Sequence, residues 1–213
     1  MDALLSPASI LSESRFEEML AWLHRNRWQA VTAGEVTRAV EDPAELPEKA
    51  VLVTFDGGCR TVLQRGLPRL RKYRAPGVVF VATELVGREA TFDSLDDPVQ
   101  VCTWDELVQL DRSDVSVQSS GLGRRRFSRL DATEQEAEVL ASRDAIDRHV
   151  GRPAEIFAYP KGDPGRGPQI VRLAGYRAAC TLEGGVNALP GADPFRLARI
   201  EVGPGTDLAT ALG

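Results

Sequence analysis

Short runs of apolar residues alternate with amphipathic segments along most of this chain. Apolar and β-branched runs predict strands over residues 50–55, 77–82, 115–119, 155–159, 176–181 and 195–202. Apolar positions on one face predict helices over residues 14–26 and 60–73. Further helices are expected over 33–41, 104–110, 169–174 and 132–150, the last of which is acidic at its start and basic at its end. Strands that alternate with helices in this way are typical of a parallel α/β sheet or barrel. Because the sequence shows neither an internal repeat nor a clear linker, we expect one domain over residues 1–213.

The first apolar run ends on a carboxylate. Residues 51–58 read VLVTFDGG, so the predicted strand delivers Asp56 to a turn made by Gly57 and Gly58. A continuous apolar run of this kind is typical of a strand that is buried on both faces. Ligands of α/β folds bind at the C-terminal ends of the strands, which makes Asp56 the first candidate for a functional side chain.

The composition narrows the classes of function. Apolar residues make up 43% of the 213 and charged residues 27%, which allows a sizeable core. The net charge of −5 argues against general nucleic-acid binding, and no apolar span approaches the length of about 20 residues that crosses a membrane. The start of the chain lacks the features of a signal peptide and its three cysteines are sparse, so we expect a cytoplasmic protein with reduced thiols.

Several motifs, in the same order, resemble those of the NodB-type polysaccharide deacetylases. VTFDGG at residues 53–58 resembles the TFDDG motif of that family, while TWDEL at 103–107 and FAYPKGD at 157–163 resemble two more of its motifs. GYRAA at 175–179 and FRLARI at 195–200 resemble its C-terminal pattern. The resemblance covers roughly residues 15–205 and implies a single-domain α/β fold, a distorted (β/α) barrel of the NodB-homology type.

The resemblance also implies a reaction, the removal of an acetyl group from an N-acetylated sugar by a divalent metal that one Asp and two His hold. In this chain the positions of those three ligands are occupied by Gly57, Ser120 and Arg124. Glycine offers no ligand atom, a serine hydroxyl is a poor ligand, and the arginine cation repels a metal ion. We therefore expect no metal site, and no other cofactor.

Asp56 matches the general base of the family, but without a metal two other interpretations of it are open. Its carboxylate could cap the following helix or pair with a cation. Arg124 is the candidate cation, since its guanidinium could replace the charge of the lost metal. Arg124 could equally belong to a solvated basic loop with Arg125 and Arg126, or hold an anionic ligand.

The motifs place further residues around the expected pocket. By resemblance, the backbone of Tyr159 contacts the oxyanion if the protein is active. Tyr159 and Trp104 would form an aromatic wall and Arg124 to Arg126 a positive rim. Trp104, Pro160 and Arg124 are the candidate substrate contacts.

The remaining reactive residues have ordinary interpretations. Cys59 has no histidine at a motif position to activate it, so we expect it to pack rather than to act as a nucleophile. His24 and His149 match no family motif and are expected at the surface or in packing contacts, which leaves the general acid of the family without a counterpart. The acidic segment 93–97 lacks the ligand spacing of a calcium loop and is expected to be solvated.

The leading hypothesis is a degenerate family member that lacks metal-dependent deacetylation and binds a carbohydrate, an anionic small molecule or a protein. The alternative is an active hydrolase of C–N (amide) bonds that deacetylates an N-acetylated sugar through Asp56 by a remodelled site. A third interpretation is a subunit whose missing residues come from a partner chain. Neither nucleic acid nor a membrane is expected as a partner.

Overall fold

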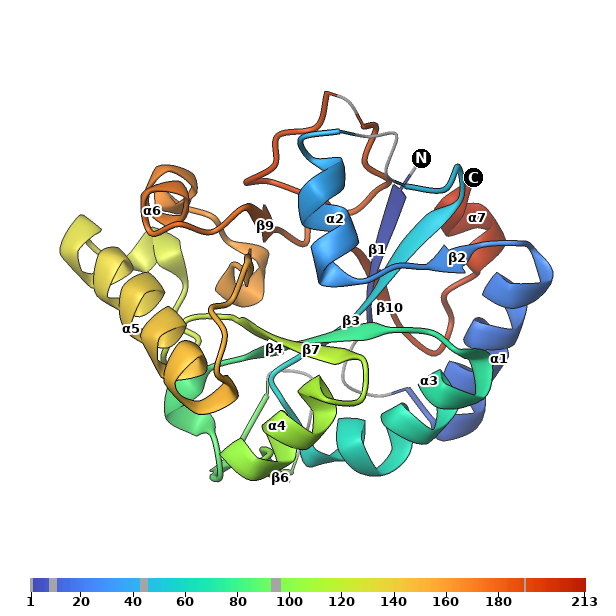
Figure 1. The fold of residues 1–213 in the computed structure, drawn as a ribbon, viewed down its shortest axis with the longest axis horizontal. Coiled ribbons are helices and arrows are strands. Elements are labelled where there is room, and N and C mark those ends of the chain that lie inside the picture. The colour runs from blue at the N-terminus through green and yellow to red at the C-terminus, as the bar shows by residue number, and fades with distance from the viewer. Residues whose placement is uncertain (1, 8–10, 43–45, 93–96, 190) are drawn as a thin grey trace.

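The computed structural model describes residues 2–7, 11–42, 46–92, 97–189 and 191–213. Its centre is a curled sheet of parallel strands in the order β10-β1-β3-β4-β7-β8-β9, with β2 paired to β3 (Figure 1). These strands are β1 Asp2–Pro7, β2 Gln29–Ala30, β3 Ala50–Asp56, β4 Gly77–Val81, β7 Val115–Ser119, β8 Ile156–Ala158, β9 Ala178–Cys180 and β10 Ile200–Val202. A parallel bridge from Cys180 to Leu197 links β9 to the segment that leads into β10, so the sheet curls toward a barrel.

Helices follow most of the strands, and all six predicted helices are present. They are α1 Glu13–Arg25, α2 Ala33–Ala39, α3 Leu67–Tyr73, α4 Trp104–Asp111, α5 Ala132–Val150 and α6 Gly167–Leu173, and a short α7, Leu208–Leu212, follows β10. The predicted 60–73 helix begins with a π-helical turn, Val62–Gly66, before α3. Three of the helices start with a capping box, in which Thr32, Thr103 and Asp131 accept from the backbone three residues on. Within the described part of the chain, no helix combines the length and apolarity needed to cross a membrane.

The strand predictions hold for the central strands and differ at the margins. Periodicity gave no sign of β1, yet β1 lies between β3 and β10. The segment 84–102, predicted as loop, contains a short antiparallel pair, β5 Glu89–Ala90 with β6 Val99–Gln100. Of the strand predicted over 195–202, only Ile200–Val202 forms a regular ladder, with β1.

The strands divide the core into two layers. Val51, Val53 and Phe55 of β3 belong to an outer layer that packs against every helix except α2. Leu52 belongs to the inner layer, where α2 covers the other face of the sheet. Because side chains alternate along a strand, Asp56 lies on the same inner face as Leu52, at the C-terminal end of β3.

Candidate functional site

An ion pair between Asp56 and Arg199 lies at the C-terminal end of β3. Nη1 of Arg199 lies 2.7 Å from Asp56 Oδ1, and Nη2 lies 3.1 Å from Oδ2, so the guanidinium holds both carboxylate oxygens. The Arg199 side chain is 1% exposed and that of Asp56 is 31% exposed. Asp56 is therefore fixed from the protein side and open toward solvent.

The remaining contacts of Arg199 explain how a cation is kept in the interior. Its Nε donates to the carbonyl of Thr181 at 3.1 Å, and its guanidinium carbon lies 5.2 Å from the centre of the Phe80 ring. Burial is the largest influence and lowers the pKa of Arg199, but the carboxylate of Asp56 and smaller contributions from Cys180 and Glu201 together raise that pKa. This pair corrects the expectation from the sequence, since the cation that holds Asp56 is Arg199 and not Arg124.

Next to Asp56, the ring of Phe92 fills the space beside Gly57. Gly57 has φ +91°, and its N–H donates to the carbonyl of Phe80 at 2.8 Å. A Cβ at this position would lie 2.4 Å from Cε1 and 2.8 Å from Cζ of Phe92, closer than any real contact. Phe92 itself is 5% exposed. A side chain at position 57 therefore requires Phe92 to move.

Ser120 and Arg124 complete this side of the site. The Ser120 hydroxyl donates to the carbonyl of Ala158 at 3.0 Å, so its proton is directed at the backbone. The guanidinium carbon of Arg124 lies 4.3 Å from the centre of the Phe92 ring, which is the geometry of a cation–π contact. Gly57, Phe92 and Arg124 thus form one packed stack beside the carboxylate of Asp56.

A buried carboxylate, Glu138 on α5, holds the loop that leads to Arg124. One of its oxygens accepts from the N–H groups of Leu122 at 2.5 Å and Gly123 at 3.2 Å, and the other accepts from Arg125 Nε at 3.0 Å. The sequence analysis missed Glu138, because an acidic residue on an amphipathic helix is normally solvated. These bonds direct the Arg125 side chain toward α5. Its charge is therefore paired with Glu138 and is not part of the positive rim that was predicted for Arg124 to Arg126.

A sequence profile described as polysaccharide deacetylase matches residues 44–179. The chain belongs to the polysaccharide deacetylase family. The match includes β3 with Asp56, the loop with Ser120 and Arg124, and β8.

Relatives and solved structures agree with this assignment. The chain is 24% identical over 194 residues to the putative polysaccharide deacetylase YxkH of Bacillus subtilis, covering 91% of this chain and 66% of YxkH. It is 31% identical over 105 residues to poly-beta-1,6-N-acetyl-D-glucosamine N-deacetylase of Escherichia coli, covering 47% of this chain and 16% of that protein. The matched part is thus less than two thirds of either relative.

Two solved structures show the same fold along nearly the whole chain. IcaB from Ammonifex degensii is 25% identical, with a TM-score of 0.81 over 95% of this chain and 92% of that one. The Streptococcus pyogenes deacetylase PplD, solved in complex with acetate, is 18% identical, with a TM-score of 0.84 over 100% of this chain and 97% of that one. The predicted NodB-type fold is therefore confirmed.

The polysaccharide deacetylase family implies a divalent metal, and the residues at this site do not fit one. The aligned positions provide a glycine, a hydroxyl that donates to a carbonyl, and a cation, with the Phe92 ring packed beside them. In the described ranges, no three His, Cys, Asp or Glu side chains come together in a way that could hold a metal ion. We therefore assign no part of a reaction to a metal ion bound by these three residues.

The backbone N–H of Tyr159, predicted to contact an oxyanion if the protein is active, has a partner within the sheet. It donates to the carbonyl of Cys180 at 3.0 Å, and an oxyanion contact by this group stays a prediction. The ring of Tyr159 is 1% exposed, and its hydroxyl donates to the carbonyl of Phe195 at 3.0 Å. Burial raises the pKa of Tyr159 far above its usual range. The predicted aromatic wall therefore loses this ring, which belongs to the outer core layer instead.

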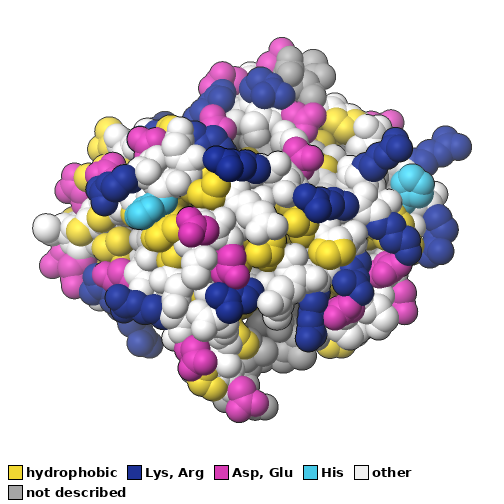
Figure 2. Space-filling model, turned by 60° about the horizontal axis from the view of Figure 1, so that its bottom comes forward, with side chains coloured by type: hydrophobic (Ala, Val, Ile, Leu, Met, Phe, Trp, Pro, Cys, Tyr) yellow, Lys and Arg dark blue, Asp and Glu magenta, His cyan; other side chains and the backbone are white. Residues whose placement is uncertain are grey.

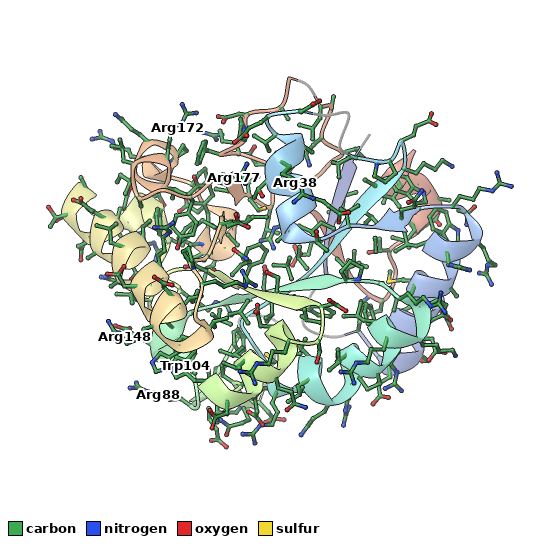
Figure 3. All side chains as sticks on the ribbon, viewed as in Figure 1. Arg38, Arg88, Trp104, Arg148, Arg172 and Arg177 are labelled. Atoms are coloured by element: carbon green, nitrogen blue, oxygen red, sulfur yellow. The ribbon has the colours of Figure 1, made fainter. Side chains whose placement is uncertain are left out.

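The other two predicted substrate contacts lie at different depths. Pro160 is buried in a tight turn, Pro160–Gly162, directly after β8. Trp104 is half-buried at the start of α4 and stacks on His149, with 4.2 Å between ring centres and 9° between planes. Figure 3 shows Trp104 on the outer side of the molecule, near Arg88 and Arg148. Substrate contact by either residue stays a prediction.

The reactive residues outside the motifs occupy the ordinary places expected of them. Burial raises the pKa of the Cys59 thiol to about 11, although Arg124 nearby lowers it, so the thiolate of a nucleophile is scarce at neutral pH. His24 and His149 are exposed, as predicted. Most of the acidic segment 93–97 lies outside the described residues.

Proposed function

We propose that this chain is a polysaccharide deacetylase-family protein that binds its ligand without metal-dependent deacetylation. The observation that carries the proposal is the Phe92 ring, which occupies the space beside Gly57 where a metal-binding carboxylate would have to stand. A cation on that ring adds an electrostatic barrier, because Arg124 is always charged and repels a divalent ion.

The ligand class that suits the site is a carbohydrate with an anionic group. Asp56 presents a half-exposed carboxylate that can accept hydrogen bonds from sugar hydroxyls, while Arg124 supplies a positive charge close by. The family name and the N-acetylglucosamine polymer named for the Escherichia coli relative support a glycan in preference to other ligands. If no glycan binds, the remaining proposal is that the chain binds a protein partner.

Hydrolysis through Asp56 alone is the weaker alternative. A carboxylate can act as general base, but cleavage of an amide also needs a proton donor at the leaving nitrogen and stabilisation of the oxyanion. The N–H of Tyr159 is already bonded within the sheet, and burial raises the pKa of the Cys59 thiol, so its thiolate is scarce. The described residues around Asp56 therefore favour binding over catalysis.

The test compares binding with acetate release on the same ligand. Chito-oligosaccharides and an acidic oligosaccharide are titrated into the protein by calorimetry, and acetate release is followed with zinc, cobalt or no added metal. We expect measurable binding that Arg124→Ala or Asp56→Asn weakens, with no acetate release above the level of the Asp56→Asn variant. Metal-stimulated acetate release that depends on Asp56 would contradict the proposal.

A further inference from the structure

A hollow of about 260 Å³ opens at the end of the sheet opposite Asp56. Two of its lining residues, Gln29 and Ala30, pair with the first residues of β3, whereas Asp56 is the last residue of that strand. The hollow is bounded by the C-terminal ends of α1 and α3. Its walls carry the rings of three residues, His24, Trp28 and Tyr73, together with the cation Arg74.

Both helices that bound the hollow end in the same way. After α1, the N–H of Trp28 donates to the carbonyl of Leu23 at 2.9 Å, and the N–H of Arg27 donates to that of His24. After α3, the N–H of Ala75 donates to the carbonyl of Leu70 at 2.9 Å, in the matching pattern. This is the Schellman motif, whose key residue adopts the left-handed conformation and is usually glycine.

In both motifs an arginine stands at the left-handed position. Arg27 has φ 62° and Arg74 has φ 51°. A residue with a side chain is less stable in this conformation than glycine. A cation is favourable near a helix C-terminus, but that benefit is available anywhere in the last turn and does not require the left-handed position. Arg74 lines the hollow, and Arg27 directly precedes Trp28 of its lining, so a role at the hollow would explain why arginine stands at both positions.

Basic residues precede or follow the lining residues of the hollow in the sequence. Arg25, Arg27 and Arg74 form no ion pair with any described residue, and Nζ of Lys49 lies 3.4 Å from the carbonyl of Asn26 at the end of α1. Figure 2 shows basic side chains gathered around a histidine at the right edge, on the side where Figure 1 places α1. Elsewhere on that face the two signs are mixed.

We propose that this hollow is a second carbohydrate site, which binds an acidic saccharide such as a chain of uronic acids. A pyranose ring has an apolar face that packs on the indole of Trp28 or the ring of Tyr73, and its carboxylate meets Arg74 and Arg27. We choose a saccharide because of the family to which the chain belongs. We choose an acidic one because Arg27 and Arg74 form no ion pair among the described residues. This site is independent of the proposed function at Asp56.

The experiment uses tetrameric oligogalacturonate titrated into the full chain, with its methyl ester as the neutral control. The central variant is Arg27→Gly with Arg74→Gly, because glycine suits the left-handed positions and the melting temperature is expected to stay equal or rise. We expect the acid to bind, the double variant to bind at least tenfold more weakly, and the ester to bind more weakly than the acid. Arg124→Ala serves as the matched change at the other site and should leave this binding unchanged.

Two results would overturn the inference. The first is absence of binding to the wild-type chain at millimolar oligogalacturonate and low salt. The second is binding that the Arg27→Gly, Arg74→Gly variant retains in full. If that retained binding is lost in Arg124→Ala, the ligand belongs to the Asp56 site, which supports the proposed function while rejecting the second site.

Discussion

The two sides of the Asp56 site differ in what holds them together. On one side, Asp56 and Arg199 form a two-point ion pair whose cation is buried. On the other side, Gly57, Phe92 and Arg124 pack as a backbone, a ring and a cation. The polar half of the site holds a charge in the protein interior, whereas the half around Gly57 is closed by the ring of Phe92.

The two halves of the site are therefore stabilised by different interactions, one by charge compensation and the other by apolar packing. A buried guanidinium must keep its carboxylate, because its removal would leave an uncompensated charge in the core. Gly57 has no side chain and no charge to compensate, so a nearby ring can pack against it and gain apolar burial. The retention of Asp56 is therefore explained by stability as well as by any role in binding.

The largest expected effect is the loss of the ion pair. Asp56→Ala leaves the Arg199 cation buried with no carboxylate, and we expect the free energy of unfolding to fall by about 3 kcal/mol or more. Arg124→Ala removes one half-buried cation–π contact and should cost about 1 kcal/mol or less. Urea denaturation of both variants measures the difference. Equal costs would show that the two halves do not differ as described.

A smaller effect is expected at Gly57. Gly57→Ala combines an unfavourable φ with a collision against Phe92, so we expect it to lower the free energy of unfolding by about 2–3 kcal/mol. Gly87→Ala is the matched control, since Gly87 has φ +77° but nothing within 4 Å of a new Cβ, and it should cost only about 1 kcal/mol. Adding Phe92→Ala should offset part of the cost at Gly57 and none at Gly87. A purely additive result would show that the ring does not fill this space.

The smallest effect concerns the thiol of Cys59 beside the stack. Its pKa of about 11 means that the thiolate fraction at pH 8 is low and rises as the pH approaches 11. We therefore expect alkylation of Cys59 by iodoacetamide to be slower than that of a free cysteine at pH 8 and to speed up with pH. Because Arg124 lowers this pKa, Arg124→Ala should slow the reaction further, by a few-fold at most. Faster alkylation in the variant would place Arg124 away from the thiol.

Much of the fold could be predicted from the sequence, because each central strand is a continuous apolar run and each main helix has a clear apolar face. The strand β1, which the sequence analysis did not predict, is short, and no turn residues before it mark its beginning. The left-handed arginines and the π-helical turn have no signal in periodicity, since both depend on backbone geometry.

At the site, the sequence motifs led to a prediction of the ligand positions but not of the residues that surround them. Gly57, Ser120 and Arg124 followed from motif spacing, whereas Arg199, Phe92 and Glu138 depend on contacts between segments far apart in the chain. Arg199 lies 143 positions from Asp56, and only the curling of the sheet brings the two together. Arg199 belongs to the FRLARI motif, which is the one feature of the sequence that could have pointed to this residue.

The most direct test of the central claim is a calorimetric zinc titration of two proteins. One is the wild-type chain, and the other carries Gly57→Asp, Ser120→His and Arg124→His together with Phe92→Ala. Without the last change, the new carboxylate would meet the ring. We predict no stoichiometric zinc binding to the wild type, and binding by the fourfold variant that weakens when Phe92 is restored. Tight, one-to-one zinc binding by the wild-type chain that is lost in Asp56→Asn would contradict the account.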